Sequence, residues 1–144
     1  MDKKHLLLTI VTPERTVLSG KPVDSVAVPA AGGELGVLPG HAPYVVQLKE
    51  GMMHYKDGPN KEFFSVLSGF AEIAPDRVLV LAEAAELAKE VDEERARQAY
   101  QKAKDKLSFK PADLDLEEAG AALRRAAARL KVAEFQRKRR RQQQ

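Results

Sequence analysis

The chain has 144 residues, 44% of them hydrophobic, and a formal net charge of +3 at pH 7, so it has room for one ordinary domain or two small ones. It contains no cysteine and three widely separated histidines, which excludes disulfides, thiolate catalysis and cysteine zinc sites and predicts that no metal is bound. No apolar run approaches the roughly 20 residues that span a bilayer, and the N-terminus does not look like a signal peptide, so we expect a cytoplasmic protein.

The first part of the chain predicts an all-β domain. From Leu6 to about Ala82, short β-type runs alternate with turn residues, which is the pattern of a sandwich or barrel. Asp57-Gly58-Pro59-Asn60 and Pro75-Asp76 predict hairpin turns. We expect an N-terminal β-sandwich over residues 1–85 with about ten short strands, nine of which can be delimited: 6–11, 16–19, 24–28, 33–38, 42–48, 51–55, 62–67, 70–73 and 77–81.

The segment from Gly33 to Pro43 holds three glycines, two prolines and a histidine. Gly36 and Gly40 can take positive φ, and the prolines fix φ, so the segment predicts a strand, a tight turn and a second strand. His41 invites a catalytic interpretation, but no nucleophile and orienting group accompany it in sequence. A structural role for His41 at the turn is the interpretation that we favour.

After Leu81 the composition changes to Ala, Glu, Lys, Arg and Leu, which favours helix. Asp92 is placed to cap a first helix, since acidic residues follow it in the first turn, and this helix is expected to run to about Leu107. Pro111 interrupts the pattern, and a second helix is expected from about Leu114. Residues 86–144 are therefore predicted to form a C-terminal α-helical hairpin domain.

Apolar residues in both expected helices recur at spacings of three and four, which is typical of a narrow helix–helix seam. A short connection favours an antiparallel hairpin. Because alanine seams bury little area, this hairpin is expected to be marginal alone and able to change shape. The seam positions are Ala96, Ala99, Ala103 and Leu107 in the first helix and Leu116, Ala119, Leu123, Ala126, Leu130 and Ala133 in the second.

The charge is unevenly distributed. Residues 120–144 hold nine basic side chains and one acidic side chain, a charge of +8, whereas residues 1–119 carry −5. The basic run 137–141 could bind nucleic acid, an anionic membrane or an acidic protein surface, or be a solvated tail. No nucleic-acid motif accompanies the run, and Phe135 is the one aromatic residue near it, which weakens the nucleic-acid interpretation.

The pattern Gly33-x-Leu35-Gly36-x-Leu38-Pro39-x-His41-x-Pro43 resembles the signature of the epsilon subunit of bacterial F-type ATP synthases. The resemblance covers most of the chain in order, with further matches at 12–13, 68–70, 78–86 and 91–96. It implies a non-catalytic regulatory and coupling subunit in the central stalk of a proton-translocating rotary ATP synthase. The implied location is peripheral, on the cytoplasmic face of the bacterial cell membrane. The chain has no P-loop, so the catalytic nucleotide sites are expected in other subunits.

The resemblance also implies a regulatory ATP site in the helical region. Val91, Asp92, Arg95 and Ala96 match the Ile/Leu-Asp-x-x-Arg-Ala motif by which some bacterial epsilon subunits bind ATP, with valine as a mild departure. The remaining contacts implied by the resemblance are Glu86, Arg125 and Arg129, together with Lys102, which stands where ATP-binding members carry arginine.

The residue chemistry is compatible with this site. Arg125 and Arg129 lie one helical turn apart and could grip phosphate oxygens. Carboxylates at Glu86 and Asp92 could accept a hydrogen bond from an adenine amino group, and Ala96 leaves space for the ring. Helix chemistry alone favours a simpler alternative, in which Asp92 caps a helix, Arg95 pairs with nearby glutamates and the other arginines form a solvated basic face.

In the family, the C-terminal helix can extend into the catalytic head, where its basic residues meet an acidic segment of the beta subunit and oppose ATP hydrolysis. Bound ATP is expected to favour the folded hairpin. The implied partners are the gamma subunit, the c-ring and the alpha and beta subunits, and no nucleic acid. The alternatives are a basic-tailed nucleic-acid-binding module and a small hydrolase that uses His41. The candidate inhibitory residues are Arg124, Arg125, Arg129, Lys131, Arg137, Lys138, Arg139, Arg140 and Arg141.

Overall fold

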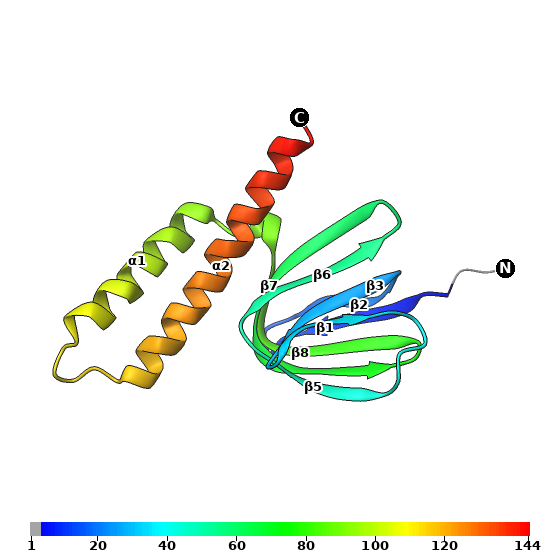
Figure 1. The fold of residues 1–144 in the computed structure, drawn as a ribbon, viewed down its shortest axis with the longest axis horizontal. Coiled ribbons are helices and arrows are strands. Elements are labelled where there is room, and N and C mark those ends of the chain that lie inside the picture. Colours follow the sequence, from blue (N-terminus) through cyan, green and yellow to red (C-terminus); the bar gives the residue numbers. More distant parts are fainter. Residues whose placement is uncertain (1–3) are drawn as a thin grey trace.

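Alternating apolar residues in the first part of the chain and alanine-rich periodic segments in the second produce two kinds of structure. The computed structural model describes residues 4–144 and has a β-sandwich followed by two helices, which confirms the predicted fold class (Figure 1). The strands are β1 (Leu6–Val11), β2 (Thr16–Val23), β3 (Ser25–Ala30), β4 (Gly33–Val37), β5 (Tyr44–Leu48), β6 (Gly51–Asp57), β7 (Asn60–Ala74) and β8 (Arg77–Leu87). They are followed by the 3-10 turn η1 (Ala88–Glu90) and the helices α1 (Glu93–Phe109) and α2 (Leu116–Gln142).

The strands surround one apolar core. Their order is β2-β1-β8-β7-β5-β3-β4, and β6 pairs with both β3 and β7. β1 and β8 run parallel, whereas the other pairs are antiparallel. Side chains alternate between the core and the surface, as in β1, where Leu6, Leu8 and Ile10 are fully buried. Phe64 on β7 is the largest of the fully buried side chains.

Residues 4–144 contain eight strands where about ten were expected, and several strands, β7 and β8 among them, are longer than predicted. The expected strands 62–67 and 70–73 are one strand, β7, which passes through Gly69 at a φ of +146°. β8 does not end at Leu81 but continues to Leu87, which lies opposite Phe64. Pairing with the first half of β7 keeps residues 82–87 extended despite their helix-favouring composition. The expected domain boundary after residue 85 therefore falls inside the last strand.

The predicted turns are confirmed. Asp57 pairs with Asn60 across the two-residue turn of the β6–β7 hairpin, and Ala74 pairs with Arg77 across the β7–β8 turn. The segment 33–43 forms β4 and the turn that leads into β5. Gly40 takes a φ of +87°, and its N–H donates to the carbonyl of Pro75 at 2.7 Å. Gly36 does not adopt a positive φ. It lies within β4, where it pairs with β3.

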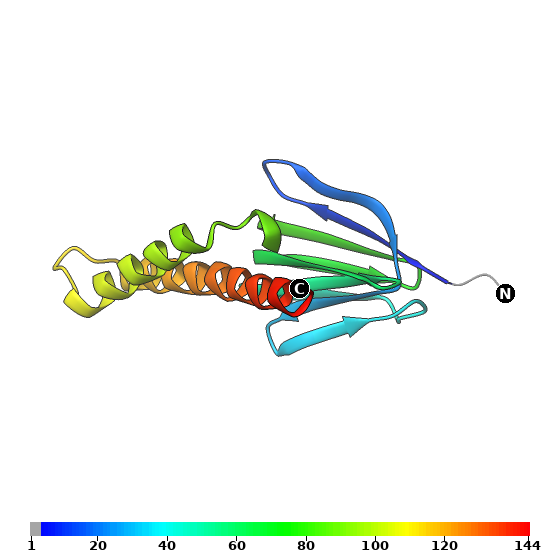
Figure 2. The ribbon, with the colours of Figure 1, turned by 90° about the horizontal axis from the view of Figure 1, so that it is seen from above.

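The two helices form the predicted antiparallel hairpin, and α2 lies between α1 and the sandwich (Figures 1 and 2). α2 contacts β6, β7 and η1 in addition to α1. The prediction assigned one apolar seam to α2, covered by one partner helix. α2 instead has two buried faces, and the sandwich-facing one was missed. On that second face, Val132 and Phe135 pack against Phe63 and Ala88.

The face of α2 that packs against α1 contains only some of the predicted seam residues. Ala119, Ala126 and Ala133 are buried, and Ala96 of α1 is fully buried. Leu116 is exposed at the start of α2. Ala99 is also exposed, and the half-buried side chain next to it is Tyr100. The basic run 137–141 belongs to α2, which continues to Gln142.

Candidate functional site

Most of the predicted ATP-binding residues lie where β8, η1, the start of α1 and the middle of α2 meet. Asp92 is the N-cap of α1, and its Oδ1 accepts a hydrogen bond from the N–H of Arg95 at 3.1 Å. Val91 ends the 3-10 turn, where its N–H donates to the carbonyl of Ala88 at 3.2 Å. Ala96 is fully buried. The capping role expected for Asp92 is therefore confirmed.

Glu86 and Arg129 are brought together across a separation of 43 residues. The Nη2 of Arg129 donates to the Oε1 of Glu86 at 3.2 Å. Because Glu86 lies on β8 and Arg129 on α2, this ion pair joins the sandwich directly to the helical hairpin.

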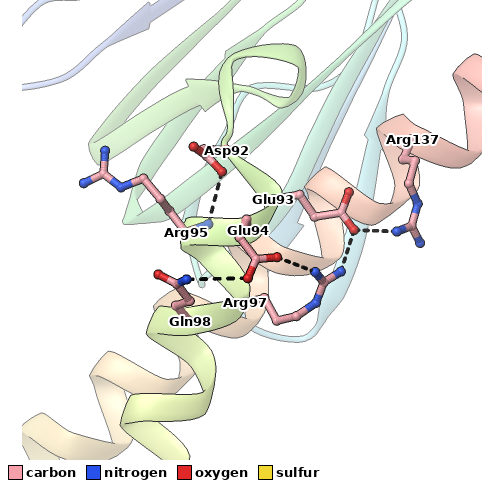
Figure 3. Close-up of polar contacts among 7 residues, drawn as sticks. All are labelled: Asp92, Glu93, Glu94, Arg95, Arg97, Gln98 and Arg137. Carbon is pink, nitrogen blue, oxygen red and sulfur yellow. Dashed lines mark hydrogen bonds and ion pairs between the residues drawn. The ribbon is translucent and has the colours of Figure 1, made fainter.

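The other charged residues of the expected site point elsewhere. The Nη2 of Arg125 donates to the Oε1 of Glu118 in the first turn of α2, at 2.9 Å. Lys102 is exposed on α1. Arg95 is exposed too, and its side chain extends away from Arg97 (Figure 3). Arg97, rather than Arg95, pairs with the glutamates of the first turn.

A charged cluster that the sequence analysis missed joins the two helices (Figure 3). The Oε1 of Glu93 accepts hydrogen bonds from Arg97 at 2.9 Å and from Arg137 at 2.7 Å. We call Glu93, Arg97 and Arg137 the Glu93 clasp. The spacing of four residues signals the pair within α1. No spacing signals a partner 44 residues away, which depends on how the hairpin closes.

These elements correspond to two family models. Residues 5–88 match the model described as "ATP synthase, Delta/Epsilon chain, beta-sandwich domain", and residues 89–134 match "ATP synthase, Delta/Epsilon chain, long alpha-helix domain". The chain belongs to the ATP synthase delta/epsilon family. It is therefore a subunit of the ATP synthase complex and is not itself catalytic. The resemblance stated from residues 33–43 is confirmed.

Curated relatives support this family over nearly the whole chain. An ATP synthase epsilon chain of Symbiobacterium thermophilum is 45% identical over 126 residues, which cover 88% of this chain and 91% of that one. An ATP synthase epsilon chain of Syntrophobacter fumaroxidans is 46% identical over 131 residues, which cover 91% of this chain and 97% of that one.

Solved structures share the fold of this delta/epsilon family chain. A chain in the Euglena gracilis mitochondrial ATP synthase, described as OSCP/F1/c-ring, has a TM-score of 0.70 and 24% identity, covering 90% of this chain and 78% of that one. A chain in the central stalk and c-ring of the Tetrahymena thermophila mitochondrial ATP synthase has a TM-score of 0.59 and 15% identity, covering 93% and 96%.

The basic residues of α2 in this delta/epsilon chain divide into anchored and open groups. Arg124 pairs with Glu50 at 3.8 Å, and Arg137 belongs to the Glu93 clasp. The guanidinium of Arg139 lies 4.6 Å from the centre of the Phe63 ring and donates to the carbonyl of Lys61 at 3.4 Å. Lys131, Lys138, Arg140 and Arg141 form the open group and are exposed, and Arg124 is also exposed despite its ion pair. The folded hairpin thus occupies part of the candidate inhibitory surface.

The outer surface of the sandwich exposes large apolar side chains. Phe70 on β7 and Leu81 on β8 lie opposite each other in the strand register, and both are exposed. Leu7 on β1 and Val45 on β5, on the strands that flank this pair, are exposed as well. Exposed apolar side chains gathered on neighbouring strands are typical of an interaction surface.

The surroundings of two histidines in the sandwich, His41 and His54, indicate structural roles. The Nδ1 of His41 lies 2.7 Å from the carbonyl oxygen of Ala42, within the turn. His54 packs on Phe63 at 5.2 Å between ring centres, and its buried Nδ1 has no hydrogen-bond partner. Burial lowers the pKa of His54 from its usual 6.5, the Glu34 carboxylate acts in the opposite direction, and lysines 61 and 56 lower the pKa further.

Within residues 4–144, no group of three or more histidines and carboxylates is arranged to hold a metal ion. The helices of that part of the chain also include none with the length and hydrophobicity needed to cross a bilayer.

Proposed function

We propose that this chain is the regulatory and coupling subunit in the central stalk of a rotary ATP synthase, peripheral on the cytoplasmic face of the bacterial membrane. Its similarity to bacterial ATP synthase epsilon chains supports this role. In this proposal the sandwich docks on the gamma subunit and the c-ring, and the exposed apolar side chains of β1, β5, β7 and β8 supply the apolar part of that contact.

We propose further that the hairpin is a reversible switch. α1 packs on α2, and α2 is held on the sandwich by the small apolar cluster around Phe63 and Val132 and by ion pairs. Such an interface is weak enough to open. In the open state α2 extends toward the alpha and beta subunits and presents its basic side chains to an acidic surface, which opposes ATP hydrolysis. No observation favours the alternative of a nucleic-acid-binding module.

ATP binding would favour the folded state. The observation that carries this proposal is the ion pair between Glu86 and Arg129, because it brings two of the expected nucleotide contacts together from β8 and α2. A ligand that touches both elements binds the folded hairpin and not the extended one, so it shifts the equilibrium toward folding. The other proposed contacts are Val91, Asp92, Arg95, Ala96, Lys102 and Arg125.

Calorimetry of the full chain tests ATP binding. ATP is expected to give binding heat that is lost in Arg129→Ala. Arg140→Ala is the matched control, since Arg140 is an exposed arginine on the same helix outside the proposed site. The absence of heat from the unmodified chain at millimolar ATP would refute regulatory ATP binding.

Co-purification with the gamma subunit tests the docking role. Phe70→Asp places a charge on the exposed apolar surface and is expected to weaken the complex, because the charge must be buried or solvated at the interface. Lys104→Asp, on the exposed side of α1, introduces the same side chain away from that surface and should leave the complex intact. Failure of the unmodified chain to bind gamma would overturn the assignment to the central stalk.

A further inference from the structure

The two arginines proposed to grip phosphate are held apart by different carboxylates. Arg129 donates to Glu86 on β8 at 3.2 Å, whereas Arg125 donates to Glu118 on its own helix at 2.9 Å. Glu118 lies seven residues before Arg125, which places its backbone about 10 Å nearer the start of α2. In this conformation Arg125 reaches back along its own helix, and Arg129 reaches across to the sandwich.

The two carboxylates have different surroundings. The side chain of Glu86 is 31% exposed and that of Glu118 is 67% exposed, while the two arginines are similarly exposed at 35% and 36%. Solvent weakens the more exposed pair, so Arg125 exchanges partners more easily than Arg129. A phosphate group, which carries more charge than a carboxylate, is a suitable competitor for the Arg125 guanidinium.

We propose that Glu118 is an affinity-determining residue that occupies the phosphate-binding position on Arg125 until ATP displaces it. This inference rests on the proposed regulatory ATP site. Because ATP must first break the ion pair, the affinity of the chain for ATP is lower than the arginines alone would give. Glu118 thereby raises the ATP concentration at which the folded hairpin is stabilised.

A purely structural role for Glu118 is the alternative to be separated. Its N–H donates to the Oδ1 of the N-cap residue Asp115 at 3.1 Å, and its carboxylate lies in the first turn of α2, where negative charge stabilises a helix. Glu117 lies in the same first turn and forms no ion pair within residues 4–144. Glu118→Gln and Glu117→Gln therefore remove the same charge from the same helix end, and both keep the backbone N–H.

The experiment measures ATP affinity of the full chain by calorimetry, alongside the thermal midpoint of each variant. Glu118→Gln is expected to bind ATP about two- to fivefold more tightly than the unmodified chain. Glu117→Gln is expected to bind like the unmodified chain, and both variants should have similar thermal midpoints. In nitrogen-15 spectra, the side-chain Nε–H signal of Arg125 should move in Glu118→Gln and on adding ATP to the unmodified chain, but not in Glu117→Gln.

The outcomes separate this inference from the proposal beneath it. Equal ATP affinity for the two glutamine variants would overturn competition by Glu118 while leaving ATP binding in place. A tighter Glu118→Gln with an unmoved Arg125 signal would overturn the route through Arg125. No ATP binding by any of the three chains would refute the regulatory site itself, and this inference with it.

Discussion

Removing the charge of Glu93 is expected to open the helical hairpin. In Glu93→Gln the Glu93 clasp loses the carboxylate that Arg137 of α2 and Arg97 of α1 share, at 2.7 and 2.9 Å. The buried Nε of Arg137 already has no hydrogen-bond partner, so the substitution leaves this guanidinium poorly paired. The expected result is a larger fraction of molecules in which α1 has separated from α2.

The size of the effect follows from the geometry. A hydrogen bond between charged groups contributes about 1.5–3 kcal/mol. The side chain of Glu93 is 22% exposed and that of Arg137 is 41% exposed, so solvent reduces this to about 1–2 kcal/mol. Arg97 keeps its bond to Glu94 at 2.9 Å, and the loss therefore falls on the contact between the helices. The open fraction should rise by about 5- to 30-fold.

Spin-label distance measurements can report this opening. The chain contains no cysteine, so probes attach only at introduced positions, for example Ala99→Cys on α1 and Lys138→Cys on α2, both of which are exposed. Glu94→Gln is the matched control, because Glu94 bonds to Arg97 and Gln98 within α1 and not to α2. The difference between the two variants should shrink as salt screens the charges.

The reasoning would be refuted if Glu93→Gln and Glu94→Gln gave the same distance distribution. It would also be refuted if Glu93→Gln and Arg137→Gln had fully additive effects, because residues that act through one shared ion pair show a coupling energy in a double-mutant cycle.

Three further predictions concern the sandwich and its contact with α2. The folded state keeps His54 neutral with a pKa below 6.5, so the contribution of His54 to stability is complete above pH 6.5 and is lost as pH falls. Urea unfolding between pH 7.5 and 5.5 should show this loss of stability, and the loss should be smaller in His54→Gln. Gly69→Ala should cost about 2–4 kcal/mol of unfolding free energy, because a Cβ at φ +146° would collide with the carbonyl of Leu81. Gly36→Ala, whose Cβ meets open space, should change it by less than about 1 kcal/mol, and similar losses for both would contradict the steric argument. Phe135→Ala should weaken docking of α2 by about 1–3 kcal/mol, seen as faster hydrogen exchange in α2 with unchanged exchange in the sandwich core; equally faster exchange in both would show that the hairpin is not a separate unit.

Local residue chemistry accounts for much of the predicted fold. The β1 strand, the turn at residues 57–60 and the N-cap at Asp92 were all predicted from side-chain alternation, turn residues and capping chemistry. The end of β8 could not be predicted this way. Residues 82–87 favour helix by composition, and only their pairing with β7 makes them a strand. As a result Glu86 projects from a sheet and not from a helix.

The candidate site, like the fold, could be predicted from the sequence only in part. The sequence identified Glu86 and Arg129 through the family resemblance, and the structure placed them in contact. The partners of Arg125 and Arg137 were not predicted. Arg125 pairs with Glu118 and Arg137 pairs with Glu93, and these pairings depend on the rotation of α2 about its axis and on its docking against α1 and the sandwich.

The sequence by itself determined the division into a β-sandwich and a helical hairpin, and its motif at residues 33–43 indicated the ATP synthase epsilon family. The division into two parts and the motif depend on side-chain periodicity, turn chemistry and residue order, which are local properties of the chain. Only the tertiary structure decided that α2 has two buried faces and that Arg129 and Arg137 pair with carboxylates of β8 and α1. Such contacts join residues more than 40 positions apart, so they exist only after the sandwich and both helices have packed together.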